Sequence, residues 1–131
     1  MTGITDLDRL LKSMSPQIQP NEFVFCTVSG ELTEYVGLKP LASFNENEGL
    51  TLVLPLQTAE RANLTFHGKF KQITLRVHSS LEAVGLTAAI SNKLTEQDIS
   101  ANVVAAYYHD HVFVPHDKAE MALKALQSFA Q

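Results

Sequence analysis

One stretch in the second half of the chain restricts the fold more than any other. In residues 71–78, apolar side chains occupy every second position: Ile73, Leu75 and Val77. A period of two is typical of a strand with one buried and one solvent-facing side. The pattern therefore predicts an antiparallel sheet that is covered on one face only.

The segments that follow this strand predict a regular order of elements. Two stretches carry apolar residues at helical spacing, and two others have the composition of strands. The predicted elements are a helix from near Gly85 to before Ile99, strands at 101–108 and 111–114 joined by a tight turn at His109 and Asp110, and a final helix behind an acidic capping box at Asp117 and Glu120.

The first half predicts a similar order with weaker signals. It begins with a short amphipathic helix that has Thr5 as its N-cap and an apolar stripe of Leu7, Leu10, Leu11 and Met14. The remaining elements are a turn at 15–21, a strand at 23–28 covered on both faces, an irregular segment or single helical turn at 31–39, hairpin strands at 41–44 and 50–54 around a five-residue polar connection, and a helix within 56–64.

One element order therefore occurs twice, in residues 22–64 and again in residues 70–130. The sequence predicts an α+β fold of two ferredoxin-like (βαββαβ) halves, 1–66 and 67–131, whose antiparallel sheets are covered on one face by helices. In neither half does the sequence clearly predict a fourth strand. We therefore expect strands to be shared or sheets to join edge to edge, and a homodimer or larger homo-oligomer to cover the remaining edges.

Charge and hydropathy disfavour two classes of partner. The chain has 10 Lys and Arg against 14 Asp and Glu, which gives a net charge of -4, the wrong sign for binding phosphate backbones. No apolar run approaches the ~20 residues that span a bilayer, and the polar N-terminus lacks the features of a signal peptide. We expect a cytoplasmic protein that binds neither nucleic acid nor membrane.

The single cysteine, Cys26, lies within the apolar run 23–28. One cysteine allows no internal disulfide and no thiolate zinc cluster. A nucleophilic thiol needs exposure and a neighbouring base, and this segment indicates neither. We expect a buried and unreactive thiol.

Residues 107–111 read Tyr-Tyr-His-Asp-His and are the most chemically suggestive stretch. His109 and His111 would form a metal-binding pair on a continuous strand, whereas a two-residue turn would place them across it. No second cluster supplies further ligands, so we expect a hydrogen-bonded turn, no metal and no cofactor. Tyr107 and Tyr108 are expected on opposite faces, one in the core and one at an interface.

Catalytic motifs are missing from the sequence. The chain has no Gly-x-Ser-x-Gly elbow, no phosphate-binding loop and no dinucleotide fingerprint. A Cys-His or Ser-His arrangement would have to be assembled by the fold. We therefore expect a protein that is not an enzyme.

Residues 75–90 read Leu-Arg-Val-His-Ser-Ser-Leu-Glu-Ala-Val-Gly-Leu-Thr-Ala-Ala-Ile, and residues 101–115 read Ala-Asn-Val-Val-Ala-Ala-Tyr-Tyr-His-Asp-His-Val-Phe-Val-Pro. Together they resemble the ACT domain. More narrowly, the whole chain is similar to small bacterial stand-alone proteins with two ACT-like halves, a group largely without assigned function. Residues 5–11 and 21–26 share this similarity, which is specific in the second half and moderate in the first.

The resemblance implies a small-molecule sensor or regulatory fold, most often for amino acids. It places the ligand, an amino acid or similar small carboxylate, where ACT units meet, near the loop between the first strand and the first helix. On this chain the implied ligand-binding residues are Ser79, Ser80, Leu81, Glu82, Val84, Gly85 and Leu86.

The residue types in this loop agree with that chemistry. Backbone N–H groups at a helix start attract a carboxylate, and Gly85 has no Cβ to keep a ligand away from the backbone. Ser79 and Ser80 add hydroxyl donors, and Glu82 would receive an ammonium group.

An alternative stays open for the same segment. Many ACT domains carry Asp and Pro just before this glycine, where the present chain has Ala83 and Val84. Ser80 would then only cap the helix, and Gly85 would only permit close packing. The corresponding function is a ligand-free oligomerisation or partner-binding module.

Overall fold

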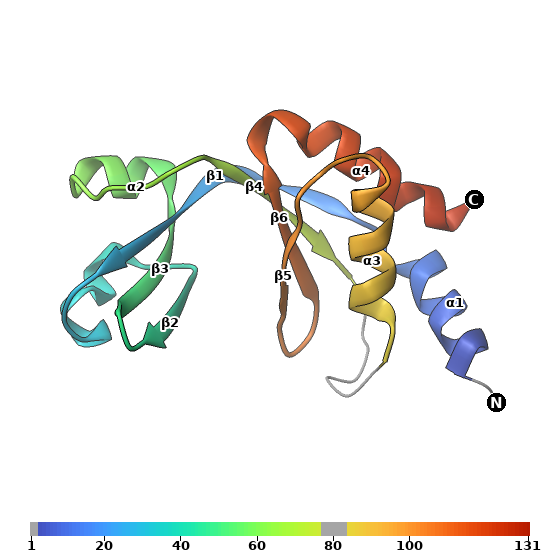
Figure 1. Cartoon of the computed structure of the whole chain (residues 1–131), viewed down its shortest axis with the longest axis horizontal. Coiled ribbons are helices and arrows are strands. Elements are labelled where there is room, and N and C mark those ends of the chain that lie inside the picture. Colours follow the sequence, from blue (N-terminus) through green and yellow to red (C-terminus); the bar gives the residue numbers. More distant parts are fainter. Residues whose placement is uncertain (1–2, 77–83) are drawn as a thin grey trace. The chain divides into compact units, whose positions relative to one another are not determined.

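The computed structural model describes residues 3–76 and 84–131 (Figure 1). The chain divides into two compact units: unit 1 comprises Met1–Pro20 and Lys71–Gln131, and unit 2 comprises Asn21–Phe70. Strand β1 (Gln17–Val28) contributes its first residues to unit 1 and the rest to unit 2. It is therefore a shared strand of the kind that the sequence predicted.

The sheet of unit 1 contains the start of β1, then β4 (Phe70–Leu75), β6 (Asp110–Pro115) and β5 (Asn102–Ala105), in that spatial order. Strands β5 and β6 are antiparallel, with Ala105 opposite Asp110. Ile73 and Leu75 on β4 are fully buried, as predicted, but Thr74 on the side predicted to face solvent is also buried. Val77 lies outside the described residues.

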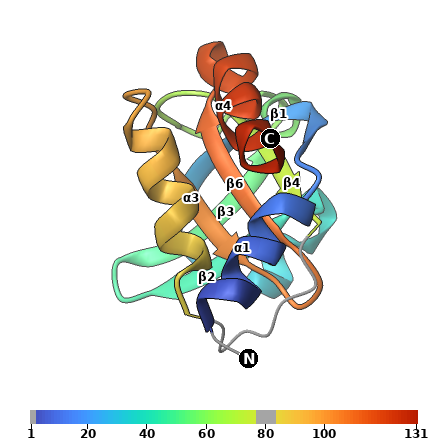
Figure 2. The same cartoon turned by 90° about the vertical axis from the view of Figure 1, so that its right-hand side faces the viewer.

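Three helices pack on one face of this sheet: α1 (Gly3–Ser13), α3 (Leu86–Thr95) and α4 (Ala119–Gln127) (Figure 2). Two 3-10 turns, η3 (His116–Lys118) and η4 (Ser128–Ala130), flank α4. Alternate residues of the strands and one stripe of each helix share a single apolar core, which includes Met14, Ile73, Leu75, Leu86, Ile90, Leu94, Val112, Val114, Ala122 and Leu126. Burial of this core is the main stabilising contribution to unit 1.

Unit 2 has the strand order β2 (Ala42–Glu46), β3 (Gly49–Pro55), β1, with antiparallel pairing throughout. Two 3-10 turns, η1 (Leu32–Glu34) and η2 (Val36–Leu38), and the short helix α2 (Leu56–Arg61) complete it (Figure 1). Its core contains Val24, Cys26, Leu50, Leu52, Leu54 and Ala59. These observations confirm the predicted α+β fold with antiparallel strands and packed helices.

Three predicted turns were wrong in length or position. The first hairpin has a two-residue connection rather than five, because Glu46 and Gly49 already pair as strand residues. The second has four residues between Ala105 and Asp110 rather than two, and the Ala106 amide closes the turn by donating to the His109 carbonyl at 3.1 Å. Strand pairing also begins at residue 17, within the stretch predicted as a turn.

Two predicted helix caps were also wrong. Helix α1 begins at Gly3, two residues before Thr5. The N-cap of α4 is Lys118, which makes no side-chain capping bond, because Asp117 belongs to the preceding 3-10 turn. The helices themselves form because their apolar stripes are buried, which outweighs the contribution of a single cap.

Candidate functional site

The first turn of α3 lies at the centre of the predicted ligand loop. Gly85 is the N-cap residue and has a left-handed backbone, with φ +97° and ψ -16°. Its carbonyl accepts the Ala89 amide at 3.0 Å, which is the first bond of the helix. The backbone amides of the first residues in a helix have no carbonyl acceptor within that helix. The N-terminal end of α3 therefore carries a partial positive charge.

Val84 and Leu86, on either side of the glycine, have opposite environments. Val84 is 90% exposed, whereas Leu86 is 3% exposed and belongs to the core of unit 1. Leu86 therefore anchors the helix and cannot offer its side chain to a ligand. Of the two side chains, only that of Val84 reaches the surface.

Gly85 also has a packing role that its sequence position did not reveal. A Cβ atom added at residue 85 would lie 3.2 Å from Cδ2 of Leu7 on α1. The positive φ favours glycine, and a larger residue would also require the Leu7 side chain to shift. The structure thus supports the packing interpretation of Gly85 and leaves its ligand role as a prediction.

The other predicted site residues, Ser79, Ser80, Leu81 and Glu82, lie outside the described residues. Of the predicted set, the structure brings together only Val84, Gly85 and Leu86.

A second polar group lies on the strands of unit 1, on the opposite side of β4 from Ile73 and Leu75. The Nδ1 atom of His111 lies 3.0 Å from Gln72 Nε2 and 3.1 Å from Thr74 Oγ1. Gln19 on β1 donates to the same Thr74 oxygen at 2.9 Å. Gln19, Gln72, Thr74 and His111 therefore connect three strands through side chains.

Sequence analysis missed this network because it assigned Thr74 to the solvent-facing side of its strand. Gln72 and Thr74 are in fact only 7% and 6% exposed. Buried polar side chains are tolerated when they are hydrogen-bonded, and each of these has a partner on a neighbouring strand. The contact of Gln72 and Thr74 with a histidine on the adjacent strand β6 is a tertiary relationship with no local sequence signal.

Burial also affects the titratable groups beside the network. Burial lowers the pKa of His111, and the neighbouring His109 lowers it further, while Asp110 acts in the opposite direction. Burial raises the pKa of the Asp110 carboxyl, which His111 partly offsets. The Nδ1 atom of His109 is buried without a hydrogen-bond partner among the described residues.

The hairpin tip differs from its prediction. Tyr107 and Tyr108 both lie in the turn and are 77% and 62% exposed, with ring centroids 5.0 Å apart in an edge-to-face arrangement. Neither ring is in the core, because the four-residue turn removes both from the strand. Within residues 3–76 and 84–131, no three His, Cys, Asp or Glu side chains are grouped so that they could hold a metal.

Cys26 is 3% exposed in the core of unit 2, as predicted, and burial raises the pKa of its thiol. A raised pKa lowers the thiolate fraction at neutral pH. In the described part of the chain, no helix has the length and apolar character needed to cross a membrane.

Two models of the ACT domain match the chain, one over residues 2–71 and one over residues 69–128. Comparison with curated proteins gives no match. The two matched regions together account for almost the whole sequence, and each corresponds to one of the repeated element orders.

Solved structures give a consistent result. A Vibrio cholerae protein of unknown function, described as a possible transport protein, is 55% identical over 99% of this chain and 100% of its own, with a TM-score of 0.91. An Agrobacterium tumefaciens protein is 13% identical, covering 88% and 87% of the two chains, with a TM-score of 0.69. The regulatory subunit of aspartate kinase from Thermus thermophilus is 8% identical, covering 92% and 100%, with a TM-score of 0.62. The last two similarities concern the fold alone.

Proposed function

The chain belongs to the ACT domain family, and from this premise we propose that it is a non-catalytic regulatory protein that senses a small molecule. The proposed ligand is a free amino acid or a similar small carboxylate. ACT domains are commonly regulatory and bind amino acids, and the fold is shared with a regulatory subunit of aspartate kinase. Sensing by a separate regulatory chain is therefore a reasonable role for this protein.

The observation that carries the proposal is the start of α3. Val84, next to the helix start, is 90% exposed and Gly85 is half-buried, so a ligand would approach the first amides of α3 from the Val84 side. A carboxylate at such a position would accept hydrogen bonds from the amides and interact favourably with the helix dipole. Ser79, Ser80, Leu81 and Glu82 complete the proposed site, with Glu82 as the partner of an ammonium group.

A thermal-shift screen of the full chain against the twenty amino acids at millimolar concentration tests the proposal. A ligand at about a hundred times its dissociation constant stabilises a protein by roughly 2.7 kcal/mol, which raises Tm by several degrees in a domain of this size. We expect such a shift for at least one amino acid.

A matched pair of variants tests the location. Val84→Asp places a negative charge beside the helix start and should abolish the shift by repelling the ligand carboxylate, whereas Val84→Asn has nearly the same shape and should retain it. Because Val84 is 90% exposed, neither change should disturb the core. No shift with any amino acid, or an equal shift in both variants, would favour a ligand-free oligomerisation or partner-binding module.

We also propose that the protein acts as a homodimer or larger homo-oligomer, with the halves 1–66 and 67–131 as its repeated ACT-like regions. Strand β5 ends the strand order in unit 1 and strand β2 ends it in unit 2, and such edges are commonly covered by pairing. Light scattering across the micromolar range measures this state, and a monomer throughout that range would contradict it.

A further inference from the structure

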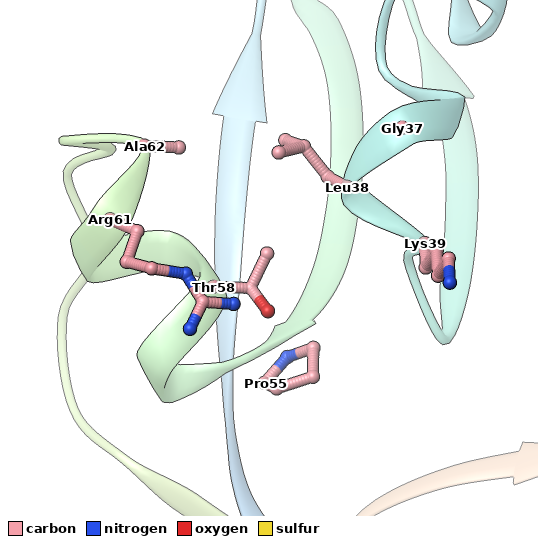
Figure 3. Close-up of a pocket in the computed structure, with 7 residues that line it drawn as sticks. All are labelled: Gly37, Leu38, Lys39, Pro55, Thr58, Arg61 and Ala62. Atoms are coloured by element: carbon pink, nitrogen blue, oxygen red, sulfur yellow. The ribbon is translucent and has the colours of Figure 1, made fainter.

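Unit 2 contains a pocket of about 540 Å³ that lies outside the proposed amino-acid site (Figure 3). One wall is formed by Gly37 and Leu38 of η2 and by Lys39, and the other by Pro55 and the α2 segment that carries Thr58, Arg61 and Ala62. This volume is within the range of small-molecule sites.

The charge of the pocket is positive, although the chain as a whole has a net charge of -4. Lys39 and Arg61 line it, and none of the lining residues that the structure describes is acidic. Neither charged side chain forms an ion pair or hydrogen bond with any residue in the described part of the chain. Two unpaired cations on one pocket favour an anionic ligand.

A neutral donor lies on the same wall as one of the cations. Thr58 and Arg61 are three residues apart on α2, a spacing that puts both on the same side of a helix, and Figure 3 draws both side chains on the α2 wall of the pocket. The Thr58 hydroxyl has no hydrogen-bond partner among the residues that the structure describes. It is therefore available to a ligand oxygen that the guanidinium also contacts.

Lys39, on the opposite wall, has an unusual backbone. Its φ of 53° and ψ of 58° lie in the left-handed region, which disfavours residues other than glycine. The turn holds it there, since the Lys39 amide donates to Val36 O at 3.0 Å and the Leu41 amide donates to Val53 O at 2.8 Å. Lys39 is the C-cap of η2, so this turn fixes its backbone at the pocket wall.

The remaining lining is apolar. Figure 3 shows Leu38 and Ala62 extending toward the space between η2 and α2 from opposite sides. Pro55 also borders the pocket. The site therefore combines anion-binding groups with a surface suited to a short hydrocarbon segment.

We propose that this pocket binds a small organic anion, a dicarboxylate or a phosphate monoester. Its acidic groups contact Arg61, Thr58 and Lys39, and its carbon skeleton contacts Leu38 and Ala62. Arginine recognises carboxylate and phosphate oxygens in the same bidentate manner, so the two ligand types share one recognition chemistry. This site is in unit 2 and does not depend on the proposed amino-acid site at Gly85 in unit 1.

The test is isothermal titration of the full chain with succinate and, separately, with glycerol 3-phosphate, at an ionic strength held constant with chloride. We expect saturable binding of at least one probe. The probe that binds more tightly shows whether the pocket prefers a carboxylate or a phosphate group. Arg61→Gln and Lys39→Asn should each weaken binding at least tenfold. Asparagine is chosen at residue 39 because it tolerates the left-handed conformation.

Lys69→Gln is the matched control, because it removes one exposed positive charge from the same unit without touching the pocket. Its affinity should equal that of the wild type. An independent measurement without substitutions is amine acylation followed by peptide mass spectrometry, in which the bound probe should protect Lys39 and leave Lys69 unprotected. Absence of saturable binding for both probes, or equal weakening in all three variants, would overturn the proposal.

Discussion

The Nδ1 atom of His111 on β6 lies 3.0 Å from the amide nitrogen of Gln72 on β4, 39 residues away in the sequence. The Gln72 amide is the donor, so Nδ1 accepts and the histidine is neutral in this arrangement. Protonation at Nδ1 would remove the acceptor and place a charge among buried groups. The direction of the His111 pKa, below its ordinary value of 6.5, is consistent with this geometry.

His111 should make stability depend on pH. Because its pKa is lowered by folding, the unfolded chain binds more protons than the folded chain below about pH 6.5, so stability falls as the pH falls through that window. The His111→Gln variant should lose less unfolding free energy than the wild type between pH 7.5 and pH 5.5, as measured by urea denaturation. The raised pKa of Asp110 has the opposite effect, because it makes stability rise as the pH falls, and it does so at lower pH. Asp110 is present in both the wild type and the His111→Gln variant.

His67→Gln serves as the control, since it removes an exposed histidine of unit 2 and should leave the wild-type slope unchanged. A His111→Gln protein with the wild-type slope would exclude the half-buried His111 as the source of the pH dependence.

Truncation of the α3 core stripe should be costly. Leu86 and Ile90 are 3% and 0% exposed, and their replacement by alanine should each lower the unfolding free energy by about 2–5 kcal/mol, because methylene burial is lost and a cavity remains. Urea midpoints measure the loss. Thr87→Ala, at an exposed position of the same helix, should change stability by less than about 0.5 kcal/mol. Losses below that value at Leu86 and Ile90 would show that this face is not core.

Gly85→Ala should destabilise the protein by about 1–2 kcal/mol, because alanine is disfavoured at φ +97° and its Cβ would press against Leu7. Gly37→Ala is a matched substitution, since an added Cβ there meets no atom within 4 Å and the backbone has no positive φ. It should be neutral or slightly stabilising, by up to about 1 kcal/mol. Thermal denaturation of the two variants compares them directly, and equal Tm values would contradict the backbone argument.

The Cys26 thiol should react slowly in the folded protein. It is buried and its pKa is raised by burial, so alkylation by iodoacetamide at pH 8 should be slower than in urea by more than about tenfold. Mass spectrometry of timed samples gives the two rates. Similar rates in both conditions would indicate that β1 opens readily in unit 2.

The sequence by itself determined the features that depend on neighbours along the chain. The period of two at Ile73 and Leu75, and the helical stripe through Leu86 and Ile90, specify which face of each element is buried, since side-chain direction follows directly from backbone period. These patterns were sufficient for the α+β fold, the antiparallel strands and the positions of most elements. The buried Cys26 followed from the same reasoning.

Only the tertiary structure decided the features that depend on distant residues. Gln72 and Thr74 are polar in the sequence and buried in the fold, because hydrogen bonds from neighbouring strands compensate for lost solvent. A side chain at residue 85 would press against Leu7, which belongs to another helix. Lys39 and Arg61 line one pocket only because the fold places the end of η2 and the α2 segment on its two walls. Hydrophobic periodicity is local along the chain, whereas these hydrogen bonds, close approaches and shared pockets arise between segments that are far apart in sequence.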